Sequence, residues 1–390
     1  MRILLVANYL PDAQESMQRF AALLGTGFAK AGHTVRTLRP SVRAGNLARS
    51  DSAAKWLGYV DKFALFPSVL REAATWAQIV HVCDHSNAPY VKYLAGRPHV
   101  VTCHDLLAVR SAIGDIPPQK TRWSGRRLQS MILTGLGNAR HIVCVSDSTR
   151  DDVLRIVPDA AKRDKITRIY NGLNYPYAPM DRGQAEGRLS RLGLPPHRPF
   201  LLHVGGNQWY KNRPGVIDIF ARLRTVADGT NLALVTVGKP WTADMRQLIL
   251  SHKLQSSVVE LSNVVEEDLR ALYSSAELML FPSLAEGFGW PVVEAQACGC
   301  IVATSNFAPM TEVGGDAAIY VDPADPESAA LKVARALRSG PCLRTTLRQA
   351  GLRNAARFSA ASMIAAYLKL YQRLAEGEPA SPPRVYASAG

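Results

Sequence analysis

Short apolar runs alternate with longer amphipathic segments through the first half of the chain. The run from Ile3 to Val6 is typical of a buried strand, and Gln14 to Ala31 has apolar residues at helical spacing. Gly32 stands where glycine commonly ends a helix. Further strands are expected at residues 33–38, 79–82, 99–103, 141–145 and 166–170. This alternation predicts a mostly parallel sheet with helices on both faces.

A second strand–helix series follows a polar, proline-rich stretch that ends at Pro199, with strands expected at residues 200–204, 232–237, 258–261, 278–281, 300–304 and 318–321. Ligands of open α/β sheets bind at the carboxyl ends of the strands, so we expect the site in a cleft between two facing units. We predict a first Rossmann-like domain over residues 1–185 and a second over 186–358. A helix over 359–374 is expected to pack back on the first domain, before a flexible tail over 375–390.

Composition narrows the class of protein. The 390 residues are 47% hydrophobic and 20% charged, which is enough apolar material for a large core. No apolar run reaches the roughly 20 residues that cross a bilayer. The apolar opening, from Met1 to Ala7, is too short for a signal peptide and has no cleavage site, so we expect a cytoplasmic protein.

The net charge of +14 favours an anionic partner: nucleic acid, an anionic membrane or a phosphorylated small molecule. The six cysteines form no CxxC pair, so we expect buried reduced thiols and no metal site. The segment 135–140 begins like a dinucleotide-binding loop but ends in Arg140, and no strand precedes it. Pro240 stands where a P-loop needs Ser or Thr. The sequence therefore supports neither a dinucleotide-binding loop nor a P-loop.

The segment from Phe281 to Ala295 carries the densest chemical signal. An expected strand runs into a loop with Gly287 and Gly289, and Pro291 then suits the first turn of a helix. Backbone amides around Phe288, Trp290 and the next turn would form a seat for a phosphate. Glu286 and Glu294 flank this seat and suit hydroxyl groups, as at the two ends of a nucleotide-sugar. Alternatively, Glu286 is a solvated loop residue and Glu294 a charge favoured by the helix dipole.

The pattern PSxxEGFGxPxxEAxxxG, with seven residues between Glu286 and Glu294, resembles the signature of retaining glycosyltransferases of family 4, which have the GT-B fold. The likeness is strong over residues 200–358 and weak in the first half. It implies an α/β fold of two Rossmann-like domains facing across a central cleft. It also implies that Glu286 binds hydroxyls of the transferred sugar and that Glu294 binds the ribose of the nucleotide.

The same resemblance extends to four further segments. Gly205 and Gly206 begin a loop whose Lys211 would neutralise the donor pyrophosphate, although Gly206 stands where many members have Arg. His104 resembles the family's histidine at the sugar site, and Ser146 is expected to cap a helix first and contact the acceptor second. Gln14, Ser16 and Arg19 lie in a loop region where the acceptor would enter, and this chain lacks the Gly-Gly pair often found there.

The resemblance implies an enzyme that moves a hexose, with mannose as a guess, from a nucleotide-diphosphate sugar to a glycan or lipid-linked acceptor. Lys211 and a helix N-terminus could stabilise the leaving diphosphate without a metal, and no DxD motif would hold one. An anionic membrane surface would suit the cluster of Lys120, Arg122, Trp123, Arg126 and Arg127, although a solvated basic face explains it equally simply.

Two other functions remain open on the sequence. A nonhydrolysing nucleotide-sugar epimerase shares the two-domain shape but needs no acceptor. A nucleic-acid-binding protein is suggested by the charge alone, and because we find no RNA or DNA motif we expect no nucleic-acid partner.

Overall fold

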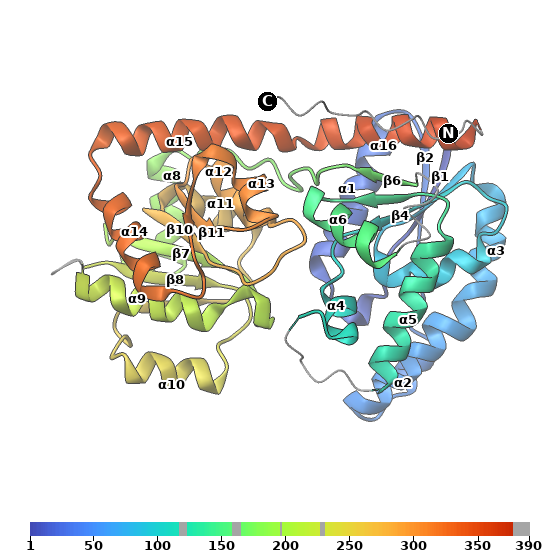
Figure 1. The fold of residues 1–390 in the computed structure, drawn as a ribbon, viewed down its shortest axis with the longest axis horizontal. Coiled ribbons are helices and arrows are strands. Elements are labelled where there is room, and N and C mark those ends of the chain that lie inside the picture. The colour runs from blue at the N-terminus through green and yellow to red at the C-terminus, as the bar shows by residue number, and fades with distance from the viewer. Residues whose placement is uncertain (117–122, 158–164, 196, 227–230, 377–390) are drawn as a thin grey trace. The chain divides into compact units, whose positions relative to one another are not determined.

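The computed structural model describes residues 1–116, 123–157, 165–195, 197–226 and 231–376. They form two compact units: residues 1–174 together with the segment that begins at Ala360, and Tyr175–Ser359. Each unit contains a parallel six-stranded sheet with helices packed around it (Figure 1). The strands pair in parallel throughout, as the alternating pattern predicts.

The first sheet has the strand order β2-β1-β3-β4-β5-β6. Its inner strands are apolar runs buried on both faces, which is why they read as continuous hydrophobic segments in the sequence. The strands are β1 (Arg2–Val6), β2 (Thr34–Leu38), β3 (Ile79–Val82), β4 (His99–Cys103), β5 (Ile142–Cys144) and β6 (Ile166–Arg168). The helices of this unit are α1 (Glu15–Lys30), α2 (Asp51–Val60), α3 (Phe66–Trp76), α4 (Leu107–Ile113), α5 (Trp123–Asn138), α6 (Asp147–Ile156) and α16 (Ala360–Ala375), and η4 (His85–Tyr93) is a 3-10 segment.

The second sheet has the order β12-β11-β10-β7-β8-β9. Its strands are β7 (Phe200–Val204), β8 (Ala233–Val237), β9 (Val258–Leu261), β10 (Leu278–Phe281), β11 (Val302–Ser305) and β12 (Ala318–Val321). Its helices are α8 (Arg182–Arg191), α9 (Arg213–Val226), α10 (Ala243–Ser251), α11 (Glu266–Ser275), α12 (Trp290–Ala297), α13 (Met310–Gly314), α14 (Pro326–Arg338) and α15 (Pro341–Ala355).

The strand orders place a topological switch point in each sheet. In the first sheet β2 lies on one side of β1 and β3 lies on the other, so the strand order reverses at β1. In the second sheet the corresponding neighbours are β7 and β10. Loops that follow such neighbouring strands diverge at the carboxyl edge of the sheet and leave room for a ligand. The two switch points therefore mark where functional side chains are to be sought.

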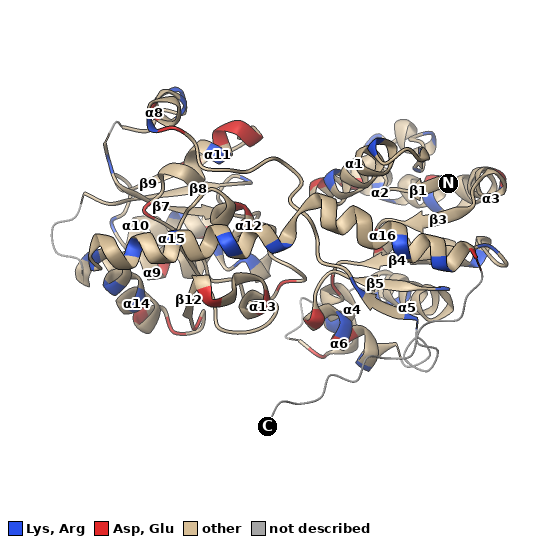
Figure 2. Cartoon of the chain, turned by 90° about the horizontal axis from the view of Figure 1, so that it is seen from above, with Lys and Arg blue, Asp and Glu red and all other residues tan. Residues whose placement is uncertain are grey.

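The boundary between the units lies before the expected one at residues 185/186. The chain enters the second unit at Tyr175 because residues that follow it pack on α11. The Tyr177 hydroxyl donates to Glu266 Oε2 at 2.6 Å, and Arg188 of α8 pairs with Asp268 at 2.7 Å. Figure 2 shows the acidic start of α11 beside α8. Helix α8 lies in the polar, proline-rich stretch, for which the sequence pattern predicted no helix.

The last helix, α16, packs on the sheet of the first unit. The Tyr367 hydroxyl lies 2.8 Å from Thr102 Oγ1 on β4, and the Tyr371 hydroxyl lies 2.5 Å from His81 Nδ1 on β3. Both tyrosines are fully buried. A Cβ at Gly27 of α1 would lie 2.5 Å from Ile364, so α1 and α16 approach each other closely at this glycine. Helix α16 is therefore part of the first unit's core.

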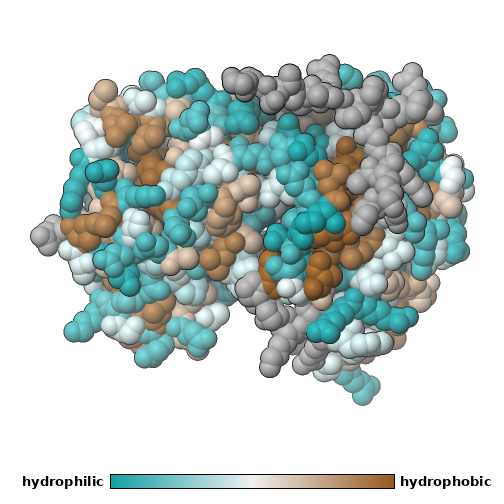
Figure 3. Space-filling view, in the orientation of Figure 1, coloured by the Kyte–Doolittle hydropathy of each residue, from teal (hydrophilic) through white to brown (hydrophobic). Residues whose placement is uncertain are grey.

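No helix in the described part of the chain combines the length and apolar character needed to cross a membrane. The face in Figure 3 mixes hydrophilic residues with smaller hydrophobic groups. All six cysteines are free thiols, five of them buried and Cys342 exposed.

Candidate functional site

Two predicted residues meet at the switch point of the second sheet. Lys211 ends the short 3-10 turn Trp209–Lys211 after β7, and Glu286 lies in the loop after β10. The Lys211 Nζ is 2.7 Å from Glu286 Oε1, and the side chains are only 16% and 7% exposed. The buried Ser283 hydroxyl donates to the same carboxylate oxygen at 2.9 Å. The expected phosphate-binding cation and sugar-binding carboxylate thus form a largely buried ion pair.

Hydrogen bonds between neighbouring loops fix this edge of the sheet. The Leu284 amide donates to the Tyr210 carbonyl at 2.7 Å, and the Asn212 side-chain amide donates to the Pro282 carbonyl at 2.9 Å. The Ser305 hydroxyl, at the end of β11, donates to the carbonyl of Ser283 at 2.5 Å. Because these bonds link the loops after three adjacent strands, the ion pair is held on a preorganised edge.

The two predicted glycines at the start of the Lys211 loop lie where there is little room for a side chain. A Cβ at Gly205 would lie 3.1 Å from His203 Nε2, and one at Gly206 would lie 2.5 Å from the Gln208 side-chain oxygen. Gly206 is the position at which many family members have Arg. Here the Gln208 side chain fills the space beside it, so an arginine would require Gln208 to move.

Helix α12 begins at the predicted phosphate seat. Its N-cap is Gly289 with φ 94°, a left-handed conformation that favours glycine, and Pro291 is in the first turn. Gly287, Phe288 and Gly289 are buried, whereas Trp290 is half-buried and packs edge-on against the Phe288 ring. The amino end of α12 thus sits in the same loop as Glu286, and its dipole favours negative charge there.

Glu294 lies on the buried side of α12 and is 5% exposed. Its Oε2 accepts a hydrogen bond from the Tyr273 hydroxyl of α11 at 2.9 Å. Burial, and then the charge of Glu294, raises the pKa of Tyr273 well above its usual value, so this phenol stays a donor. The structure therefore places Glu294 on α12 with one oxygen already engaged by the protein.

Arg213 is a residue of this edge that the sequence reasoning missed. It is 3% exposed at the start of α9, and its guanidinium donates to Asn207 Oδ1 and to the Lys239 carbonyl. These bonds connect the loops after β7 and β8. Burial lowers the pKa of Arg213, although Glu260 opposes the shift. Its position just before the apolar run of α9 was the sequence feature that could have indicated it.

In the first sheet, His104 directly follows β4 and is 6% exposed. Its Nε2 lies 3.0 Å from the Cys83 carbonyl, and its ring packs edge-on against Phe20 at 4.6 Å between centroids. Burial lowers the pKa of His104, which Asp84 partly offsets, so the neutral ring is favoured. The carbonyl requires the hydrogen on Nε2, which leaves Nδ1 as the acceptor nitrogen.

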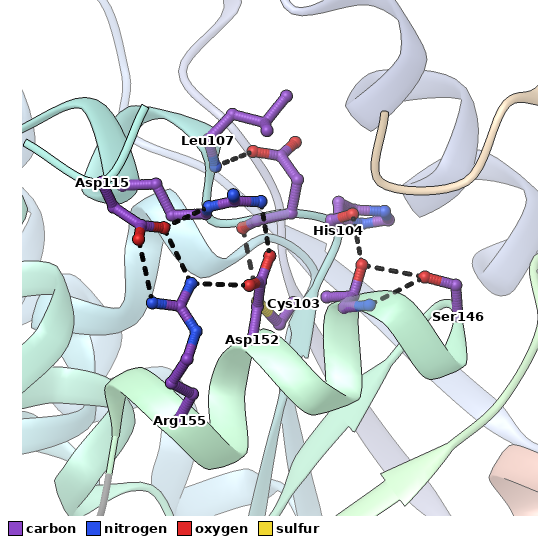
Figure 4. A network of polar contacts seen from close by, with 10 residues as sticks. Cys103, His104, Leu107, Asp115, Ser146, Asp152 and Arg155 are labelled. Carbon is purple, nitrogen blue, oxygen red and sulfur yellow. Dashed lines mark hydrogen bonds and ion pairs between the residues drawn. The ribbon is translucent and has the colours of Figure 1, made fainter. Parts of the chain in front are cut away.

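A polar network supports the strand end that carries His104 (Figure 4). Arg110 of α4 binds Asp115 at 2.7 Å and Asp152 of α6 at 3.1 Å, and Arg155 binds the same two carboxylates. The hydrogen bond from Arg155, followed by that from Arg110, lowers the pKa of Asp115. The network joins α4 to α6, the two helices that follow β4 and β5.

Ser146 is the N-cap of α6, as the sequence predicts. Its Oγ accepts from the Thr149 amide at 3.0 Å, and the residue is fully buried. Gln14, Ser16 and Arg19 are exposed at the start of α1, after the loop that follows β1. Gln14 contacts Asn8 through its side-chain oxygen. These four residues, the predicted acceptor contacts, thus lie at the carboxyl edge of the first sheet.

A buried cluster at the switch point of this sheet was also missed. Asn8, after β1, donates to Asp84 Oδ2, after β3, at 2.6 Å. The same carboxylate lies 3.0 Å from His85 Nδ1. Burial alone would lower the pKa of His85, but Asp84 raises it to about 9, and Asp105 adds to this shift. Asp84 and His85 come just after the buried strand β3, as His104 comes just after β4, and this position was the available signal.

The predicted basic cluster is only partly described. Lys120 and Arg122 lie outside the described residues. Trp123 begins α5 and is 75% exposed, and the Arg127 guanidinium lies 5.8 Å from the centre of its ring. Arg126 is also exposed. Across the described ranges, no group of three or more His, Cys, Asp or Glu side chains is arranged to hold a metal ion.

Family models match both halves of this chain. The family model described as glycosyl transferases group 1 matches residues 189–354, and the model of glycosyltransferase family 4 matches residues 17–175. The O-antigen chain mannosyltransferase B of Escherichia coli is 27% identical over 241 residues, which are 61% of this chain and 61% of that relative. The chain therefore matches only about three-fifths of that relative's length.

Two solved structures share the fold. The sucrose-phosphate synthase from Thermosynechococcus elongatus superposes with a TM-score of 0.75 at 19% identity, covering 96% of this chain and 99% of that one. HepE from Anabaena, crystallised in complex with UDP and glucose, has a TM-score of 0.73 at 14% identity and covers 95% of this chain and 99% of its own. At these identities the likeness shows the fold.

Proposed function

The chain belongs to the group 1 glycosyltransferases of family 4, with the GT-B fold, and we propose that it transfers a hexose from a nucleotide-diphosphate sugar to a glycan or lipid-linked acceptor. The observation that carries this proposal is the buried Lys211–Glu286 pair at the β7–β10 switch point, in the same loop as the start of α12. A cation, a helix N-terminus and a carboxylate form one surface that suits a diphosphate joined to a polyol.

On binding, the donor diphosphate would take the place of Glu286 beside the Lys211 ammonium. Glu286 would then accept hydrogen bonds from hydroxyls of the transferred sugar, still held by the Ser283 hydroxyl. Glu294 would accept a hydrogen bond from the ribose in addition to the one that it accepts from Tyr273. Gly205, Gly206, Gly287 and Gly289 would let backbone amides approach the phosphates.

In the proposed reaction, the bond between the anomeric carbon and the diphosphate oxygen breaks. The acceptor hydroxyl oxygen bonds to that carbon from the same face, which retains the configuration, and its proton passes to the departing diphosphate. Negative charge grows on the diphosphate as its bond breaks. Lys211 and the dipole of α12 would stabilise that charge more in the transition state than in the ground state.

His104 would act as a neutral hydrogen-bond acceptor for a hydroxyl of the transferred sugar. Its Nε2 hydrogen is committed to the Cys83 carbonyl, so Nδ1 would receive the hydroxyl hydrogen. Burial lowers the pKa of His104 below its ordinary value, which favours the unprotonated nitrogen at neutral pH. Gln14, Ser16, Arg19 and Ser146 are the proposed acceptor contacts.

Mannose is the proposed sugar because the E. coli relative is named a mannosyltransferase, and a nucleoside diphosphate is supported by the UDP complex of HepE. The base is not assigned by either likeness. We further propose that transfer needs no metal, since Lys211 supplies the positive charge at the diphosphate. Activity that survives an excess of EDTA would support this point, and activity that returns only with added Mg²⁺ or Mn²⁺ would contradict it.

The epimerase reading is not favoured, because both family models describe glycosyltransferases. A direct experiment separates the two reactions. The protein is incubated with GDP-mannose, UDP-glucose and related donors, with and without bacterial glycan and lipid-linked acceptors, and the sugar and its anomeric configuration are read by NMR. We expect an α-linked product from an α-linked donor only when acceptor is present. An altered donor sugar without acceptor would overturn the proposal.

We also propose a cytoplasmic protein that can bind peripherally to an anionic membrane through the exposed Trp123, Arg126 and Arg127. An aromatic ring flanked by cations suits the membrane interface. The double variant Arg126→Gln/Arg127→Gln should lose sedimentation with vesicles that contain phosphatidylglycerol while keeping transfer to a soluble acceptor. Unchanged sedimentation would contradict this part.

A further inference from the structure

A recess of about 370 Å³ opens at the amino edge of the first sheet. It is formed by the end of η4, the end of α5 and the residues that precede β4, β5 and β6. His99 begins β4 and His104 follows its end, so the recess lies roughly 16 Å along the strand from the proposed sugar contact. It is therefore separate from the site described above.

The lining of this recess is strongly basic. Its charged residues are Lys92, Arg97, Arg140 and Lys165, and no Asp or Glu belongs to the lining among the residues that the structure describes. Lys92 and Arg140 are exposed and Arg97 is half-buried. Within the described ranges, neither Arg97 nor Arg140 forms an ion pair. Their charges are thus available to an anion.

Partly buried hydrogen bonds hold the cationic segments in place. The ring of His99, which is 5% exposed, contacts the Arg97 carbonyl through Nδ1 at 2.9 Å and accepts from the Arg140 amide through Nε2 at 2.9 Å. Lys165 donates to the Ala139 carbonyl at 2.9 Å. One neutral imidazole therefore ties together the two segments that carry the arginines, because its two nitrogens play opposite roles.

The surroundings of His99 fit an electropositive recess. Burial lowers the pKa of His99, and the charges of Arg140 and Lys165 lower it further, while the bond to the Arg97 carbonyl opposes them. The histidine thus stays neutral between the two arginine segments at neutral pH. The positive charge remains on the guanidinium and ammonium groups that face the recess.

We propose that this recess is a second anion site, which binds a phosphate monoester or diester group. Arginine forks match phosphate oxygens in pairs, and the cations surround one compact hollow instead of following a track along which a nucleic-acid backbone could lie. The phosphate could belong to a lipid headgroup or to a soluble phosphorylated compound. The inference does not depend on the proposed transfer reaction.

The test uses the full chain with the donor seat removed by Lys211→Gln, and inorganic phosphate as the probe. Calorimetry at low ionic strength should show saturable phosphate binding to this variant. Adding Arg97→Gln and Arg140→Gln should weaken that binding by about tenfold or more, since two charge-assisted contacts are lost. Adding Arg335→Gln and Arg353→Gln instead, two exposed arginines of the second unit, makes the same change in net charge and should leave binding intact.

A second variant tests the site in case the Arg97→Gln/Arg140→Gln protein does not fold. Lys92→Gln alters only an exposed side chain and should also weaken phosphate binding, by a smaller factor. Vesicles of phosphatidylcholine with or without phosphatidylglycerol identify the source. Loss of binding to anionic vesicles in the Arg97/Arg140 variant supports a lipid headgroup, and loss for free phosphate alone supports a soluble ester. No saturable binding, or binding unchanged by the Arg97/Arg140 substitutions, would overturn the proposal.

Discussion

Lys211 and Glu286 neutralise each other in the structure, at 2.7 Å between the ammonium and the carboxylate. Both side chains are largely buried, and the Ser283 hydroxyl donates a hydrogen bond to the carboxylate. A diphosphate that binds Lys211 must displace the Glu286 carboxylate, so the Lys211 ammonium remains paired with an anion. The pair therefore preserves the site's geometry until a donor arrives.

Replacing Lys211 by Gln should lower kcat/KM for the donor by about a hundredfold or more, because charge compensation at the leaving diphosphate is lost. Steady-state kinetics with the best donor of the panel measures this effect. Lys253→Gln, an exposed lysine in the turn after α10, is the charge-matched control and should behave as the unmodified protein. Equal losses in both variants would remove Lys211 from the diphosphate site.

The Asp84–His85 pair predicts a pH dependence of stability. The folded pKa of His85, about 9, exceeds its ordinary 6.5, so the pair's contribution is complete below 6.5 and is lost as the pH rises through 9. His85 lowers the pKa of Asp84 against the effect of burial, so the contribution also fades as the pH falls below about 4.

We therefore expect His85→Gln to lower the free energy of unfolding by up to about 3 kcal/mol at pH 6 and by much less at pH 10. Urea denaturation at both values measures the difference. A penalty that is the same at pH 6 and pH 10 would show that His85 is not held as a cation in the folded protein.

At the scale of elements, the start of α12 depends on one glycine. Gly289 has φ 94°, and a Cβ there would lie 2.4 Å from the Cε of the buried Met310. The loop can thus turn into α12 with its amino end beside Glu286 only if this position lacks a side chain. Gly193, which follows α8, has φ 76° but no described atom within 4 Å of its virtual Cβ.

Gly289→Ala should destabilise the protein by about 2–3 kcal/mol and raise the donor KM, since both the left-handed backbone and the contact with Met310 oppose the methyl group. Gly193→Ala should lower the free energy of unfolding by only about 1 kcal/mol, from the left-handed backbone alone, and should leave the donor KM unchanged. Chemical denaturation and donor kinetics of both variants measure these effects. If the two variants had the same KM, the α12 turn would not be part of the donor site.

The strands could be predicted well from the sequence, whereas several helices and the side-chain pairings could not. Strands β3, β4, β7, β9, β10 and β12 have the predicted bounds, because buried parallel strands are short apolar runs between turn residues. Helix α8 was missed because its mean composition is polar and only Ala185 is buried. The bonds from Arg213 to the Lys239 carbonyl and from Asn8 to Asp84 were missed because each joins loops that are distant in the sequence.

At the scale of the whole molecule, the chain builds its first unit from both of its ends. Helix α16 supplies two fully buried tyrosines, Tyr367 and Tyr371, which bond to side chains of β4 and β3. Met363, Leu370 and Leu374 are buried on the same helix. The hydrophobic core of the first unit is therefore complete only when α16 packs on the sheet.

A chain that ends at Ser359 lacks the buried side chains of α16, so the core of its first unit contains a cavity. We expect the free energy of unfolding of that unit to fall by about 5 kcal/mol or more. Thermal unfolding followed by circular dichroism, together with limited proteolysis, measures the loss. A chain that ends at Glu376 keeps α16 and serves as the control. An unchanged melting temperature for the shorter chain would contradict the role given to α16.

The central claim is that one edge of the second sheet binds the diphosphate and the sugar of the donor. A crystal structure with an intact, unreactive analogue of the preferred donor tests it most directly. We predict phosphate oxygens within hydrogen-bonding distance of Lys211 Nζ and of the amides at the start of α12, with sugar hydroxyls on Glu286. Density for the analogue at any other place on the protein, with the Lys211–Glu286 pair intact, would contradict the account.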